Sequence, residues 1–328
     1  AAQFVQNPWY PVAEPSDAQA SADMADASRD LTAKLVKLVQ AMQEIKAEED
    51  SRVNSYEIFV NQKQTHIRNS RGVDVTFSGF DCEIEVVTNS RKDDHEIEIY
   101  KDLRFSDKSA EKIIAEVRGM FHTGRQRLNA VPTRQNEHAD VLLTGNAVGS
   151  FLQYFAMHTN ASYQYMGVTK AKIGEAITGA DADPLNIRLV PTLDGSAKNA
   201  PYDETGMPVA ERVLFENGIC RSYWGSLQHA HYIGMKDTTS MNNMVVEGGS
   251  KTLDELRSMP HIEITDFSAF DMDAVSGTCG GEIRLAYESD GTTSHPTTSG
   301  SLSARYDDVL KNLTFSKETQ QINNRVVP

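Results

Sequence analysis

Histidine, glutamate and cysteine residues occur in several segments whose spacing could support a zinc peptidase. The segment TGNAVGSFLQYFAMHTN, residues 144–160, has apolar residues at positions 148, 151, 152 and 155, which predicts an amphipathic helix with His158 on the same stripe. A helical zinc-peptidase site needs two histidines on one face and a glutamate beside the first, which takes a proton from metal-bound water. This segment has neither a second histidine nor a glutamate. We therefore expect His158 to be a packed residue near the end of the helix.

Two other histidine-containing segments are candidates for metal sites. His95 and Glu96 lie in HEIEIY, where apolar and polar residues alternate as in a strand, so they do not form a helical zinc motif. His229 and His231 in HAH have a spacing that would place both rings on one side of a strand, which is a known metal-ligand arrangement. No third ligand is evident, and we interpret this pair as surface or partly buried histidines. A metal site there remains an alternative.

Two acidic pairs have the spacing of calcium ligands. They are Asp181 with Asp183 in GADADP, and Asp271 with Asp273 in FDMDAV. Neither pair continues into the glycine and distal glutamate of a calcium loop. The sequence therefore predicts solvated loop carboxylates at both places.

Cys279 lies in SGTCGG, where the glycines would let another main chain approach closely, as in a nucleophile's loop. No histidine is near in sequence, so an unreactive thiol beside turn glycines is favoured, and a cysteine nucleophile remains an alternative. The other cysteines, Cys82 and Cys220, are far away and form no CxxC pair. This pattern indicates reduced thiols in a cytoplasm.

The elements that would position these residues begin with a helix over 28–50, whose apolar residues are spaced four and three apart. Alternating segments over 55–105, broken at NSRG and NSRKDD, predict an antiparallel meander. Ser106 or Asp107 is expected to cap the next helix, and the polar stretch 122–138 suggests a domain boundary near residue 130.

The second half begins with an apolar strand, ADVLLT, before the helix that ends in His158. Asn217 and Gly218 predict a tight hairpin turn, and Thr252 with Glu255 fits a capping box. HIEITDFSAFDMD and GEIRLAYES are two further predicted strands, separated by SGTCGG. The prediction is an α+β, antiparallel, strand-rich protein of two domains: residues 1–130, a linker plus a helix-and-meander domain, and residues 131–328, a larger strand-rich domain.

Several segments, taken in order, resemble the TldD/PmbA family, often called modulators of DNA gyrase. They are NSRGVDVTFSGFDCEIEVV, YMGVTKAKIGEAI, YDETGMPVAERVLFENGICRSYWGSLQHAHYIG, VVEGGSKTLDELRS and ITDFSAFDMDAVSGTCGGEIRLAYESDG. The resemblance runs from about residue 28 to the end of the sequence. It implies a two-subunit cytoplasmic metallopeptidase system that acts on peptides and small unfolded proteins.

In that family the TldD type carries HExxxH and a late cysteine as zinc ligands, and the PmbA (TldE) type lacks them. This chain has GNAVGSFLQYFAMH where a TldD-type chain would show HExxxH. We therefore identify it as similar to the PmbA/TldE type and assign no catalytic, metal-binding or cofactor-binding residue and no cofactor. Cys279 lies in a comparably late region but is not assigned as a ligand, because its helical partners are missing.

The predicted function is a metal-free, non-catalytic subunit that forms a peptide-binding cleft with a TldD-like zinc peptidase subunit. One alternative is an independent hydrolase that uses Cys279 or a His229/His231 metal site. Another is a stand-alone peptide-binding homodimer. A neighbouring gene encoding HExxxH would favour the first reading, bound zinc the second, and neither the third.

Composition limits the partners. The 328 residues include 46 Asp and Glu against 32 Lys and Arg, and the resulting net charge of −14 would repel a phosphate backbone. Direct DNA binding is therefore not expected. No run approaches the roughly 18 apolar residues of a membrane span, so no membrane association is expected either.

Overall fold

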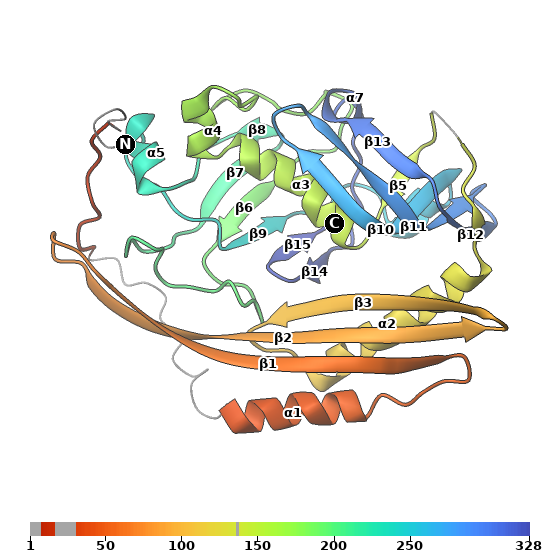
Figure 1. Ribbon diagram of the computed structural model, residues 1–328. Helices are drawn as coiled ribbons and strands as arrows, with labels where there is room; N and C mark the ends of the chain where they lie inside the picture. Colours follow the sequence, from red (N-terminus) through yellow and green to blue (C-terminus); the bar gives the residue numbers. More distant parts are fainter. Residues whose placement is uncertain (1–7, 17–30, 136–137) are drawn as a thin grey trace, which may run out of the picture.

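The computed structural model describes residues 8–16, 31–135 and 138–328 (Figure 1). The predicted start of the first helix at Ser28 and most of the predicted linker lie outside these residues. The first half contains two helices and one antiparallel sheet of order β1-β2-β3. Its elements are α1 (Leu31–Gln43), β1 (Ser51–Arg68), β2 (Asp74–Lys92), β3 (His95–Phe105) and α2 (Ala110–Asn129).

The predicted meander is confirmed, but two of its predicted strands are one. GVDVTFSGF and DCEIEVVTN form the single strand β2, and Gly79 within it pairs with Lys63 of β1. A glycine weakens the interior of a strand but does not have to end it. Cys82, Ile84 and Val86 are fully buried on the face that α1 and α2 cover, as the alternation predicts.

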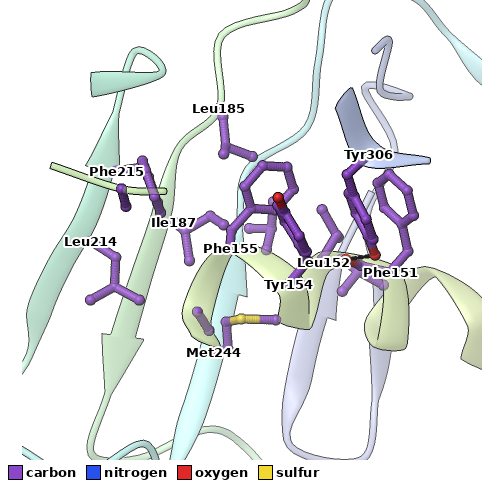
Figure 2. Packing of buried hydrophobic residues seen from close by; sticks show 14 of the residues in the cluster. Phe151, Leu152, Tyr154, Phe155, Leu185, Ile187, Leu214, Phe215, Met244 and Tyr306 are labelled. Atoms are coloured by element: carbon purple, nitrogen blue, oxygen red, sulfur yellow. Dashed lines mark hydrogen bonds between the residues drawn. The ribbon is translucent and has the colours of Figure 1, made fainter. Parts of the chain in front are cut away.

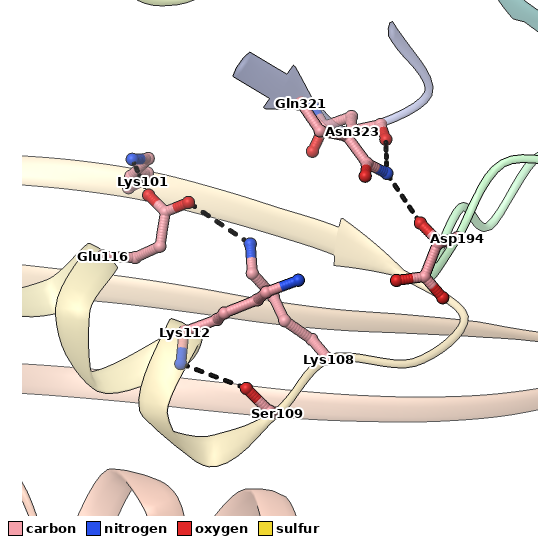
Figure 3. Close-up of polar contacts among 8 residues, drawn as sticks. All are labelled: Lys101, Lys108, Ser109, Lys112, Glu116, Asp194, Gln321 and Asn323. Carbon is pink, nitrogen blue, oxygen red and sulfur yellow. Dashed lines mark hydrogen bonds and ion pairs between the residues drawn. The ribbon is translucent and has the colours of Figure 1, made fainter. Parts of the chain in front are cut away.

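Helix α2 is capped by Ser109, so the prediction of Ser106 or Asp107 was wrong. The Ser109 side chain accepts a hydrogen bond from the Lys112 amide (Figure 3). The Ser106 amide instead donates to the Gly195 carbonyl at 2.8 Å. The Ser106 amide, directly after β3, is therefore bonded to the loop of the second half that contains Gly195, and the helix cap follows at Ser109. A further contact lies close by, because the Gln321 side chain donates to the Asp194 carbonyl at 2.7 Å.

The second half contains two six-stranded sheets with α3 (Asn146–His158) between them (Figure 1). The first has the order β4-β12-β11-β10-β5, with β13 paired to β11. At its two ends, β4 pairs in parallel with β12, and β5 pairs in parallel with β10. Its strands are β4 (Val131–Pro132), β5 (Val141–Leu143), β10 (His261–Asp273), β11 (Thr278–Ser289), β12 (Ser294–Thr298) and β13 (Ser301–Arg305).

The second sheet has the order β14-β15-β9-β6-β7-β8. Its strands are β6 (Ile187–Val190), β7 (Arg212–Glu216), β8 (Ile219–Cys220), β9 (Asn243–Val246), β14 (Gln320–Ile322) and β15 (Arg325–Val327). The short helices of the second half are α4 (Ala161–Met166), α5 (Leu227–Tyr232), α6 (Leu253–Arg257) and α7 (Tyr306–Val309). The predicted hairpin joins β7 to β8, with positive φ at Asn217 (50°) and Gly218 (76°). The capping box of Thr252 and Glu255 at α6 is also confirmed.

The prediction that SGTCGG forms a turn was wrong for its second half. Cys279, Gly280 and Gly281 lie in β11, and only the residues before Thr278 turn. A Cβ atom at Gly280 would overlap the Leu302 carbonyl of β13, and one at Gly281 would overlap the Ala269 carbonyl of β10. These glycines therefore allow close packing against neighbouring strands.

The largest hydrophobic cluster surrounds α3 (Figure 2). Phe151, Leu152, Tyr154 and Phe155 pack against the second sheet and against Tyr306. The Tyr154 and Tyr306 rings are stacked at a centroid distance of 3.7 Å. A separate cluster lies between α1, α2 and the three-stranded sheet, and a third, small cluster contains Ile264, Ile283 and Ala286. The polar stretch 122–138 is helical as far as Asn129, and the division of the chain near residue 130 stays a prediction.

Residues 8–16 form a strap between the two halves. At one end the Tyr232 hydroxyl of α5 donates to the Pro8 carbonyl at 2.5 Å, and the Trp9 ring packs edge-on against His231. At the other end the Asn69 side chain, in the β1–β2 turn, donates to the Ala13 carbonyl at 2.7 Å. Among the described residues, no helix has the length and apolar character needed to cross a membrane.

Candidate functional site

A cleft of about 1750 Å³ lies beside the β5 edge of the first sheet. Its walls come from β5 and the start of α3, from α6 and β10, from β11 and β13, and from the chain between α7 and β14. The walls are both apolar and polar, and the cleft includes the start of α3 and Cys279, two of the places at which the sequence suggested a metal or a nucleophile.

The helix α3 contributes no metal-ligating atom to this cleft. Its contribution comes from Gly145 at the N-cap and from Val148, Phe151 and Leu152. Zinc in proteins is bound by Cys, His, Asp or Glu side chains, and none of these four residues is one of them. The helix wall is therefore suited to apolar contact.

Cys279 also lines the cleft, but its thiol is poorly placed for chemistry. The residue is only 7% exposed, and burial raises the pKa of the thiol to about 11. An interaction with the Tyr306 side chain opposes this shift only in part. Because the thiolate is the nucleophile and the metal ligand, a thiol with this pKa is unreactive near neutral pH.

His158 does not line the cleft and is completely buried, as expected of a packed residue. Burial lowers the pKa of its imidazole to about 4, and the Lys170 ammonium adds to this effect. Its Nδ1 accepts a hydrogen bond from the Lys170 amide at 3.1 Å, so the neutral ring carries its proton on Nε2. An interaction with the Ala274 backbone opposes part of this lowering of the pKa, and the nearby Tyr154 hydroxyl has no hydrogen-bond partner among the described residues.

His229 and His231 lie on the short helix α5, which does not give the strand arrangement of the alternative metal site, and they are partly buried and exposed, respectively. The Ser226 side chain accepts a hydrogen bond from the His229 amide and starts this helix. Residues two apart on a helix do not face each other. Both rings lie near Tyr232, but His229 also lies beside Tyr165 and His231 beside Trp9.

One aspartate of each pair, Asp183 and Asp273, holds a loop or turn in place. Asp183 accepts from the Ser250 hydroxyl at 2.8 Å and from the Phe315 amide at 2.9 Å. Asp273 accepts from the amides of Val275 and Ser276 in the β10–β11 turn. Within the described ranges, no three His, Cys, Asp or Glu side chains come together as a metal-ligand group. The residues present therefore do not fit a zinc site.

The edge of β5 offers main-chain hydrogen-bonding groups to the cleft. The Ile262 amide donates to the Asp140 carbonyl at 2.9 Å, and the Thr144 amide donates to the Ile264 carbonyl at 3.1 Å. In a parallel pair, alternate residues of a strand bond to the same neighbour. The N–H and C=O groups of Val141 and Leu143 therefore point to the other side of β5, where no strand pairs with it in the described part of the chain.

The cleft has a polar wall as well. Glu263 of β10 accepts two hydrogen bonds from the Arg257 guanidinium of α6, at 2.9 and 2.7 Å. The side chain of Glu263 is only 9% exposed, so this pair is a fixed part of the wall. Sequence reasoning did not find this pair or the β5 edge, because residues 141–143, 257 and 263 come together only through the parallel β5–β10 pairing.

Residues 136–328, which include every strand and helix that lines the cleft, match the family model described as the PmbA/TldA metallopeptidase C-terminal domain. The chain belongs to the PmbA/TldD family. No curated protein matches the sequence.

The fold of this family member is also found in solved structures. TldE from Thermococcus kodakarensis is 18% identical with a TM-score of 0.73, and the match covers 100% of this chain and 79% of that one. A proposed modulator of DNA gyrase from Thermotoga maritima is 16% identical with a TM-score of 0.76, covering 99% and 78%. Another from Bacteroides thetaiotaomicron is 15% identical with a TM-score of 0.71, covering 97% and 74%. The α+β, strand-rich fold predicted from the sequence is confirmed.

Proposed function

We propose that this PmbA/TldD family member is a metal-free, non-catalytic subunit that binds an extended peptide in the cleft and acts with a TldD-like zinc peptidase subunit in the cytoplasm. The observation that carries the proposal is the cleft itself. It combines a free strand edge with an α3 wall that has no metal-ligating side chain.

The free edge supports peptide binding by strand addition. An extended peptide can pair with the N–H and C=O groups of Val141 and Leu143, and such main-chain bonds give affinity without demanding one sequence. Broad sequence tolerance is what a subunit that handles peptides and small unfolded proteins requires.

The decisive assay is peptide hydrolysis by this chain alone, by a TldD-like partner alone and by the two mixed. We expect no cleavage by this chain, and chelator-sensitive cleavage that is enabled or enhanced in the mixture. Elemental analysis of the purified chain should find no stoichiometric zinc. Chelator-insensitive cleavage by this chain alone, lost in Cys279→Ala, would instead establish a cysteine hydrolase.

A proline variant tests the binding mode. Val141→Pro removes an N–H from the free edge but leaves the bonds to β10 intact, because those bonds use the neighbouring residues. We expect weaker peptide binding and less enhancement of the partner, with thermal stability nearly unchanged. Leu142→Pro is the matched control, since it removes an N–H bonded to β10 and should lower the thermal stability.

A further inference from the structure

We infer that the cleft selects peptides in which apolar and polar side chains alternate, an inference that rests on the proposed peptide-binding function. A peptide paired with β5 extends the sheet, so its successive side chains point to opposite faces of that sheet. The two faces beside β5 differ in chemistry.

The apolar face is the one to which Leu143 points. Leu143 packs against both the large cluster around α3 and the small cluster of Ile264, Ile283 and Ala286. Ile264 is its register partner on β10. A peptide side chain in register with Leu143 therefore points to the face that Val148 and Phe151 of the α3 wall line.

The polar face is the one to which Leu142 points. Its register partner is Glu263, which is held by Arg257. Because the charges of Glu263 and Arg257 neutralise each other, this face favours polar side chains without selecting for either charge. An apolar side chain placed there would leave the exposed part of the Arg257 guanidinium, 44% of the side chain, beside a surface that cannot hydrogen-bond to it.

The test compares two fluorescein-labelled nonapeptides of identical composition by fluorescence anisotropy with the intact chain. One alternates valine and threonine, and the other has the same residues in two blocks. We expect the alternating peptide to bind about tenfold more tightly, because in every register the block peptide places either a valine on the polar face or a threonine on the apolar face. Equal affinities would overturn the inference and leave the proposed function standing, whereas no binding of either peptide would count against both.

Two adjacent residues of β5 supply a matched pair of variants. Leu143→Gln places an amide on the apolar face and should weaken binding of the alternating peptide several-fold. Leu142→Gln places the same amide on the polar face and should therefore weaken binding of the alternating peptide less than Leu143→Gln does. The reverse ranking would overturn the inference, and the comparison of the two peptides stands even if Leu143→Gln does not fold.

Discussion

At the scale of single residues, burial determines which of the chemically suggestive side chains can react. Cys279 lines the cleft, yet its thiol has a pKa raised to about 11 by burial. Burial raises the pKa of the Cys82 and Cys220 thiols to about 11 as well. Burial also keeps His158 neutral. The same types of residue that suggest catalysis in the sequence thus serve as packing residues.

Thiol titration checks the state of the cysteines. All three cysteines are free and buried, so an aromatic disulfide reagent at pH 7.5 should label none of them within minutes in the native protein. In denaturant it should label all three. Rapid native labelling that is lost in Cys279→Ala, and retained in Cys220→Ala, would contradict the assignment of Cys279 as unreactive.

His158 makes stability depend on pH. Its folded pKa of about 4 lies below the unfolded value of 6.5, so between these values the unfolded state binds more protons and stability falls as the pH falls. From pH 7 to pH 5 this group alone should cost about 2 kcal/mol of unfolding free energy. Urea denaturation at both pH values should show a difference smaller by about that amount in His158→Gln. An unchanged pH dependence in the variant would mean that His158 is protonated or exposed.

At the scale of elements, the sequence predicted the regular patterns and missed what depends on tertiary neighbours. The helices around Ile113 and Phe155, the turn at Asn217 and Gly218, and the capping box at Thr252 carry local signals and are present. The three residues of HAH are too few to show a helical period.

The two errors in the predicted elements, at the α2 cap and at SGTCGG, have a common cause. The α2 cap lies at Ser109 because Ser106 is held by Gly195, and the glycines after Cys279 lie in a strand because β10 and β13 approach closely there. Neither neighbour is visible in the local sequence. The cleft was inaccessible to sequence reasoning for the same reason, although its β5 strand was predicted.

Two glycines of α2 give a matched test of its packing. A Cβ atom at Gly124 would overlap the Ser90 side chain of β2, so Gly124→Ala should lower the unfolding free energy by about 1 to 3 kcal/mol. A Cβ atom at Gly119 of the same helix would meet no atom of the described residues within 4 Å, and Gly119→Ala should raise this free energy by about 0.5 to 1 kcal/mol. Chemical denaturation measures both, and a stabilising Gly124→Ala would show that α2 does not pack closely on β2.

At the scale of the whole molecule, charge and connection between the two halves matter most. The net charge of −14 disfavours a nucleic-acid partner. The contacts between the two halves include α2 with β10, where Arg127 lies 3.9 Å from Asp266, the Ser106–Gly195 hydrogen bond, and the strap. Burial raises the pKa of Asp266, and the Arg127 guanidinium opposes this shift.

The gyrase-related descriptions of similar structures suggest a DNA-binding assay. We expect no duplex binding tighter than the micromolar range at physiological salt, because this charge repels phosphates. Fluorescence anisotropy with a labelled duplex at two salt concentrations measures this. Submicromolar affinity that falls steeply with salt would reveal a local basic surface that overrides the net charge.

The strap gives the molecule a built-in optical signal. The chain has two tryptophans, of which Trp9 on the strap is 71% exposed, whereas Trp224 is partly buried and donates its indole N–H to the Ala156 carbonyl at 2.8 Å. Trp9 should therefore supply red-shifted emission that is readily quenched by acrylamide, and Trp224 the blue-shifted, protected component. Because His231 lies edge-on to Trp9, release of the strap would change the intensity of the first component while the second still shows a folded core. Undocking of the strap can thus be followed in real time in the unlabelled protein.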